Sequence, residues 1–186
     1  MRLFIGIPLA PAVREALNEQ ISPWRVLFPR VRWVKSSLWH LTLHFLGSVP
    51  VEDARWFCQC LEESPLTDKI RGATLSFTET GHFRHGRRGV LWTGIAPDPG
   101  LLDLHRLLST LLREADLPCD ERPFSPHITV GRVPTTRYRE MERLFREYFS
   151  GRKLFLPSQP ATPVVLYESQ LTKQGPIYTP LFRREI

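Results

Sequence analysis

His40-Leu41-Thr42-Leu43 and His127-Ile128-Thr129-Val130 alternate polar and apolar residues in the same way. Residues i and i+2 of a β-strand share a face, so each stretch predicts a strand that presents one imidazole and one hydroxyl on one side. The aliphatic residues of each stretch then point to the opposite side, toward a hydrophobic core. The two stretches hold equivalent places in the two halves of the chain, and this duplication decides the fold that we expect.

Strands and helices follow the same order around each stretch: strand, helix, His-x-Thr strand, helix, strand. The elements expected in the first half are strands at residues 3–7, 40–43 and 73–80, and helices over 13–24 and 51–61. Those expected in the second half are strands at 90–95, 127–130, 162–171 and 177–182, and helices over 101–115 and 138–148.

This order predicts an α+β fold built as one bilobal domain over residues 1–186. The internal repeat divides the chain at about residues 1–86 and 87–186. We expect two pseudo-symmetric lobes, each a mostly antiparallel sheet with two outer helices. The two His-x-Thr strands should then face each other across a cleft between the lobes.

Composition restricts the class of protein. The chain has 186 residues, 42% of them hydrophobic, which is enough for a core that folds alone, and we expect a monomer. Its formal net charge of +6 favours polyanionic partners such as nucleic acid, although simple solubility would explain the charge as well.

The cysteines and apolar stretches indicate the compartment. The three cysteines, Cys58, Cys60 and Cys119, are an odd number, and the first two would point in different directions on a helix. The apolar run at residues 3–9 is interrupted by Gly6 and Pro8, unlike a signal peptide. We therefore expect a reduced cytoplasmic protein without disulfides and without a membrane partner.

Two imidazoles that meet over a cleft can act as an acid and a base. One neutral imidazole accepts a proton from a nucleophile while one imidazolium donates a proton to a leaving group. The hydroxyls of Thr42 and Thr129 can donate hydrogen bonds to phosphoryl oxygens. The alternative is that all four are ordinary sheet residues, but matched positions in a repeat favour catalysis over that alternative.

A metal site is the rival explanation for clustered histidines. His40 and His44 have the i, i+4 spacing of a zinc-binding helix, but on a strand four residues span about 13 Å, too far to share one ion. No carboxylate recurs beside either His-x-Thr stretch. We therefore expect no metal and no other cofactor, and interpret His44, His82, His85 and His105 as surface or core histidines.

The chain resembles a known family, the two-histidine phosphoesterases, and within it the bacterial and archaeal RNA 2',3'-cyclic phosphodiesterases once called 2'-5' RNA ligases. The resemblance spans nearly the whole chain. The stretches that carry it are Arg2 to Ile7, His40 to Gly47, Phe124 to Arg132, Leu166 to Leu171 and Gly175 to Tyr178.

The resemblance implies that a terminal 2',3'-cyclic phosphate is hydrolysed to a 2'-phosphate. It assigns His40 as proton donor and His127 as proton acceptor, with Thr42 and Thr129 as phosphate contacts. Arg132 matches a basic residue often found at this place in the family; an exposed charge at a strand end is the alternative. The expected partners are RNA with 2',3'-cyclic phosphate ends, or cyclic nucleotides.

Other residues are candidates for contacts with RNA. The rings of Trp33, Trp39, Phe124 and Tyr167 lie near the motifs in sequence and could stack on bases, although most are expected in the core. The basic run Arg84 to Arg88 could contact phosphates or be a solvated loop. Two other functions stay open: a 2'-5' RNA ligase or 2'-5' phosphodiesterase on the same site, and a noncatalytic RNA-binding module, which would need no matched acid and base.

Overall fold

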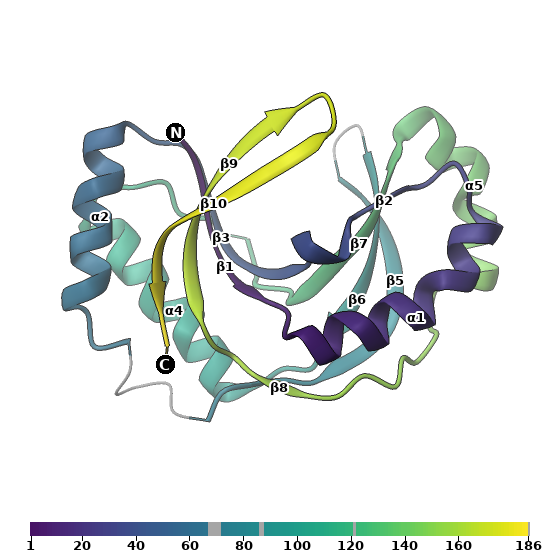
Figure 1. Ribbon diagram of the computed structural model, residues 1–186, viewed down its shortest axis with the longest axis horizontal. Coiled ribbons are helices and arrows are strands. Elements are labelled where there is room, and N and C mark those ends of the chain that lie inside the picture. The colour runs from purple at the N-terminus through teal and green to yellow at the C-terminus, as the bar shows by residue number, and fades with distance from the viewer. Residues whose placement is uncertain (67–71, 86–87, 121, 186) are drawn as a thin grey trace.

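The computed structural model describes residues 1–66, 72–85, 88–120 and 122–185, and Figure 1 shows an α+β molecule with two lobes side by side. Its strands are β1 (Arg2–Pro8), β2 (Arg32–Trp33), β3 (His40–Ser48), β4 (Thr74–Leu75), β5 (Phe77–His85), β6 (Arg88–Ile95), β7 (His127–Pro134), β8 (Gln159–Pro160), β9 (Val164–Thr172) and β10 (Gly175–Arg184). Its helices are α1 (Pro11–Leu27), α2 (Val51–Glu63), α4 (Pro99–Glu114) and α5 (Thr135–Tyr148), with a 3₁₀ turn, η1 (Ser36–Leu38).

One antiparallel sheet runs through both lobes. Its strand order is β10-β9-β1-β3-β7-β6-β5, with β2 beside β7, while β4 and β8 form a separate two-stranded sheet. The strands within each lobe pair over several residues, but β3 and β7 pair only through Leu41 and Ile128. The lobes therefore meet at one short junction, from which β3 and β7 diverge.

The lobes exchange elements between the two halves of the sequence. Strands β9 and β10, from the end of the chain, complete the lobe of β1 and β3, whereas β5, from the first half, completes the lobe of β6 and β7. The helices are exchanged in the same way (Figure 1), since each helix of the first half lies beside one of the second half: α2 packs beside α4, and α1 lies beside α5. Between α1 and α5, Trp24 Nε1 donates a hydrogen bond to the carbonyl of Tyr148. The predicted pair of lobes is present, but each lobe contains elements of both halves.

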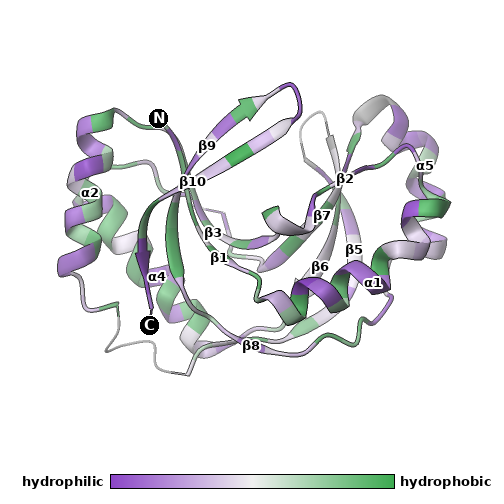
Figure 2. Ribbon diagram, in the orientation of Figure 1, coloured by the Kyte–Doolittle hydropathy of each residue, from purple (hydrophilic) through white to green (hydrophobic). Residues whose placement is uncertain are grey.

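The helices bury the faces that their apolar spacing predicts, with differences at the helix ends. Val13, Leu17 and Ile21 of α1 are fully buried, and Figure 2 shows hydrophobic and hydrophilic residues alternating along this helix. In α2, however, Val51 is 41% exposed, and Phe57 is buried instead. Val51 is the first residue of its helix.

Cys58, Cys60 and Cys119 are all free. Within the described ranges, no helix is long and apolar enough to cross a membrane. Of the basic run that could contact RNA, Gly86 and Arg87 lie outside the described residues, so its role stays a prediction.

Candidate active site

The junction of the lobes brings the two motifs together. Leu41 and Ile128 are directly paired and fully buried, so the residues on either side of them point to the opposite face. The antiparallel direction of the two strands sets His40 and Thr129 on one side of this pair, and Thr42 and His127 on the other. Each of these four side chains is half-buried. The predicted pairs of imidazoles and hydroxyls thus share one face of the sheet.

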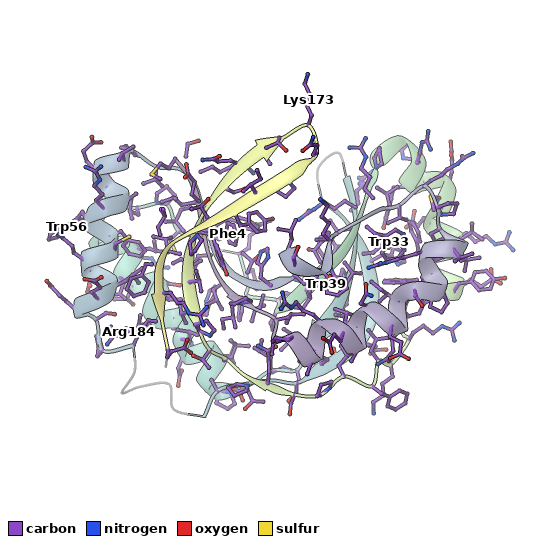
Figure 3. All side chains as sticks on the ribbon, in the orientation of Figure 1. Phe4, Trp33, Trp39, Trp56, Lys173 and Arg184 are labelled. Atoms are coloured by element: carbon purple, nitrogen blue, oxygen red, sulfur yellow. The ribbon has the colours of Figure 1, made fainter. Side chains whose placement is uncertain are left out.

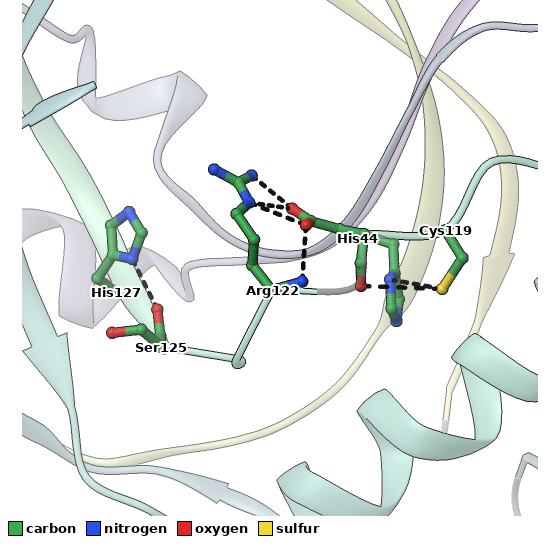
Figure 4. Close-up of polar contacts among 6 residues, drawn as sticks. His44, Cys119, Arg122, Ser125 and His127 are labelled. Atoms are coloured by element: carbon green, nitrogen blue, oxygen red, sulfur yellow. Dashed lines mark hydrogen bonds and ion pairs between the residues drawn. The ribbon is translucent and has the colours of Figure 1, made fainter. Parts of the chain in front are cut away.

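Both histidines are held in the same way by their own chain. His40 Nδ1 donates to the carbonyl of Leu38, at 2.7 Å, and His127 Nδ1 donates to the carbonyl of Ser125, at 2.8 Å (Figure 4). A carbonyl only accepts, so each Nδ1 carries a hydrogen and each Nε2 of the neutral ring is the basic nitrogen. The fold therefore fixes the tautomer and aims the second nitrogen of each ring away from the backbone.

A glycine lies on the strand next to each histidine. Gly6 of β1 is paired with Thr42, and a Cβ there would lie 2.7 Å from the carbonyl oxygen of Leu41 and 3.2 Å from His40 Cδ2. Gly94 of β6 is paired directly with His127. The absence of a side chain at Gly6 lets β1 pass close beneath the ring of His40.

Aromatic rings flank both histidines at similar geometry. The ring of Tyr178, on β10, meets His40 edge-on at 5.4 Å and 89°, and Phe83, on β5, meets His127 at 5.5 Å and 88°. Phe4, labelled in Figure 3, packs on His40 at 4.8 Å, and Trp92 lies 6.3 Å from His127. Each imidazole therefore has two apolar walls, both supplied by strands of its own lobe.

Burial and one cation favour the neutral form of both imidazoles. Burial lowers the pKa of His40 to about 4, in spite of its hydrogen bond to Leu38, and the charges of Arg132 and His127 lower it further. The pKa of His127 is also lowered, by burial first and with a further contribution from Arg132, against its hydrogen bond to Ser125. The guanidinium of Arg132, which is half-buried on β7, thus acts on both members of the pair.

Arg132 also lies close enough to Tyr178 to influence it. Burial raises the pKa of the Tyr178 hydroxyl, and the charges of Arg132 and Arg2 oppose that rise. Arg132 comes from the lobe of β7 and Tyr178 from the lobe of β10. The charge of Arg132, in one lobe, therefore acts on the histidines of both lobes, and a positive potential at this place favours binding of an anion.

The other described histidines are structural, as the sequence predicts. His44 is buried and its Nε2 lies 3.1 Å from the carbonyl of His105, to which it donates. His105 stacks between His44 and Phe124, and His82 Nδ1 lies 2.6 Å from Ser150 Oγ. Across the described ranges, no three His, Cys, Asp or Glu side chains are grouped so that they could hold a metal ion.

The four aromatic residues proposed from the sequence to stack on bases lie in different parts of the structure. Trp39 is 2% exposed and belongs to the core, and Phe124 is occupied by its stack on His105. Tyr167 stacks on Phe4 at 5.0 Å, one ring away from His40. Trp33 lies on β2, beside β7 but on the side of α1.

Sequence reasoning missed the rings that do touch the histidines. Phe4 and Tyr178 lie within stretches that carry the family resemblance, and Trp92 is the counterpart of Phe4 in the second half of the repeat. The repeat could have indicated that pair. Phe83 gave no such signal, because it reaches His127 only through the pairing of β5 with β6 and of β6 with β7.

A sequence profile of the 2'-5' RNA ligase superfamily matches residues 13–162. The chain belongs to this superfamily. Among relatives named RNA 2',3'-cyclic phosphodiesterase, that of Escherichia coli strain K12 is 32% identical over 188 residues, which cover 98% of this chain and 94% of that one. The relative from Thermotoga maritima is 31% identical, with the same coverage. A relative from Geobacillus stearothermophilus, 28% identical, is matched over 41% of its own length.

Similar solved structures confirm the predicted fold class. A crystal structure of a phosphoesterase matches with a TM-score of 0.78 at 28% identity and covers 100% of this chain and 97% of that one. Escherichia coli LigT complexed with 3'-AMP matches with a TM-score of 0.74 at 30% identity and the same coverage. Both matches extend over the full length of this chain.

Proposed function

We propose that this protein is an RNA 2',3'-cyclic phosphodiesterase that works by two-histidine acid–base catalysis without a metal. The observation that carries the proposal is the matched pair of Nδ1 hydrogen bonds to Leu38 and Ser125, which leaves the Nε2 atoms of His40 and His127 as two equivalent proton-transfer groups on one face of the sheet. The names of the superfamily relatives support the same chemistry.

In the proposed reaction His127 acts as base and His40 as acid, the roles that the family resemblance implies. His127 Nε2 takes a proton from water as the water oxygen attacks phosphorus. The bond from phosphorus to the 3'-oxygen breaks, and His40 gives its Nε2 proton to that oxygen. The product is a 2'-phosphate with a free 3'-hydroxyl.

The substrate itself would supply the protonation state that His40 needs. A pKa of about 4 leaves His40 neutral near pH 7 before substrate binds. A bound cyclic phosphate carries one negative charge, which opposes the charge of Arg132 and favours an imidazolium. Thr42 and Thr129 would donate hydrogen bonds to the nonbridging oxygens, and Arg132 would stabilise the charge that develops on them.

The experiment offers a nucleoside 2',3'-cyclic phosphate and identifies the product by phosphorus NMR. A 2'-phosphate is the expected result. A dominant 3'-phosphate would reverse the assignment of the leaving oxygen, and no hydrolysis of either a mononucleotide or an RNA end would overturn the proposal.

The same site chemistry allows the alternative that gives the superfamily its description, 2'-5' RNA ligation. In that reaction a hydroxyl replaces water at phosphorus, so the acid and base keep their places. Incubating RNA fragments with cyclic phosphate and 5'-hydroxyl ends, and comparing joined with hydrolysed product, decides between the two activities.

A further inference from the structure

A concave site separate from the histidines lies between α1 and the segment that leads into the first motif. It has a volume of about 300 Å³ and is lined by Asn18, Arg25, Trp33, Val34, Lys35 and Ser36. We call it the α1 pocket. Its lining combines two cations, two neutral polar side chains and one indole, and includes no carboxylate.

The cations of the α1 pocket are available for a ligand. Arg25 Nε is buried without a hydrogen-bond partner in the described part of the chain, where buried polar atoms are normally paired. No ion pair between described residues includes Arg25 or Lys35. An arginine with an unsatisfied buried nitrogen beside a lysine is suited to bind the oxygens of a phosphate.

Trp33 forms a fixed wall of this pocket. Its Nε1 donates to the carbonyl of Phe28 at 3.3 Å, and its Cε3 would lie 3.5 Å from a Cβ built at Gly131. Trp33, labelled in Figure 3, is half-buried. A ring that is already oriented loses little freedom when a nucleobase stacks on it.

A short stretch of chain joins the pocket to His40. The chain passes from Lys35 through η1 to Leu38, whose carbonyl holds His40, so Lys35 and His40 are separated by at most roughly 15 Å. On the other side, β2 pairs Arg32 with Arg132 and Trp33 with Gly131. An RNA strand whose last phosphate lies at the histidines would reach the pocket within a few nucleotides.

We infer that the α1 pocket binds RNA upstream of the cyclic end, with a backbone phosphate on Arg25 and Lys35 and a base against Trp33. The inference rests on the proposed function and extends it from the terminal phosphate to the preceding nucleotides. It predicts that the protein prefers an oligonucleotide over a mononucleotide, because only the longer substrate occupies both places.

The test compares a nucleoside 2',3'-cyclic phosphate with a five-nucleotide RNA that ends in the same group. In the variant Arg25→Gln/Lys35→Gln, kcat/KM for the oligonucleotide should fall about tenfold or more, while kcat/KM for the mononucleotide stays at the wild-type value. The dependence of oligonucleotide binding on salt should also flatten, by about 0.7 in the logarithmic slope for each phosphate that the variant no longer binds. The control, Arg55→Gln/Arg139→Gln, removes the same charge from exposed positions on α2 and α5 and should change neither substrate's kcat/KM.

A direct binding measurement keeps this inference separate from the proposed function. Fluorescence anisotropy of a labelled five-nucleotide RNA with a 2'-phosphate end needs no turnover, and the pocket variant should bind it about tenfold more weakly than wild type. If wild type hydrolyses neither substrate but this binding difference remains, the proposed function fails and the pocket assignment stands. Equal effects of the pocket variant on both substrates, or an effect on neither, would overturn the pocket assignment.

Discussion

Leu41 of β3 is paired with Ile128 of β7, and each of these residues directly follows the histidine of its motif. A pairing between equivalent positions of a repeat lies on the axis that relates its two copies. The local twofold axis of the molecule therefore passes between Leu41 and Ile128. Equivalent groups on the two strands are then brought to the same face at similar distances from this axis, so one sequence motif used twice can supply both members of the proposed acid–base pair.

Replacement of either histidine should disable the proposed reaction. His40→Ala and His127→Ala should each lower turnover of a 2',3'-cyclic nucleotide by roughly 10² to 10⁴-fold, the range for a lost general acid or base. His82→Gln is the control, since His82 faces Tyr138 and Phe145 of α5 and should keep near-normal turnover. Normal turnover in a folded His40 or His127 variant would remove that residue from the mechanism.

The two threonines should contribute less than the histidines. Thr42→Val and Thr129→Val keep the β-branched shape that suits a strand and remove only the hydroxyl. The loss of one hydrogen bond to a charged oxygen costs about 1.5–3 kcal/mol, so kcat/KM should fall about 10- to 150-fold in each variant. Steady-state kinetics provide the measurement, with Thr110→Val on the exposed face of α4 as the matched control. Equal activity of all three variants would contradict the role of the hydroxyls.

The sequence predicts which segments form strands and helices, and which side of each is buried, better than it predicts which strands pair. Strict alternation through His40-Leu41-Thr42-Leu43 is enough to place Leu41 in the core and His40 on the open face, because side-chain direction in a strand is a local property. Which strands pair is decided by contacts between distant residues. The pairing of β9, near the end of the chain, with β1, near its start, has no local signature, whereas β5 and β6 are neighbours in the sequence.

The same reasoning applies to the candidate site. His40, His127, Thr42 and Thr129 could be predicted because the repeat marks all four. Tyr178 could not, since it reaches His40 only because β10 folds back over β9, from the far end of the chain. The α1 pocket could not be predicted either, because its lining comes from two segments that approach one another only when α1 packs on the lobe of β7.

The charge of Arg132 should shift the pH range of activity. This charge lowers the pKa of both His40 and His127, so Arg132→Gln should raise both values and move the bell-shaped profile of kcat/KM toward higher pH. At the optimum, kcat/KM should fall about 10- to 100-fold, since the variant also lacks the charged hydrogen bond to the phosphate. Arg132→Lys keeps a positive charge and should keep the pH profile close to that of wild type. A profile that is unchanged in Arg132→Gln would mean that the guanidinium does not act on the pair.

Activity should not depend on divalent ions. The residues that form the site offer imidazoles, hydroxyls and a guanidinium, and a guanidinium beside the histidines disfavours a second positive charge. Turnover after dialysis against a strong chelator should therefore equal turnover before it. Loss of activity that zinc or manganese restores would revive the metal explanation for His40 and His127, and a parallel measurement of Tm would show whether the chelator had affected folding.

The burial of His105 in its stack between His44 and Phe124 should make the free energy of unfolding fall as the pH drops into the mildly acidic range. The pKa of His105 is lowered to about 4, by burial and then by the charge of His44, with Asp120 opposing and Arg106 adding to the effect. Between this value and the ordinary value of 6.5 the unfolded chain binds more protons than the folded protein. The stabilisation is therefore complete above pH 6.5 and is lost as the pH falls toward 4.

Replacing His105 by phenylalanine tests this argument, because it keeps the ring stack and removes the titrating group. His105→Phe should lose less stability than wild type between about pH 6.5 and pH 4, with a difference on the order of 1 kcal/mol after allowance for the partial exposure of His105. The backbone carbonyl of residue 105, which accepts from His44 Nε2 and from Ser109 Oγ, is unaffected by the change. Urea unfolding at several pH values gives the free energies. Parallel curves for the two proteins would show that the acid sensitivity comes from other groups, such as His40 and His44.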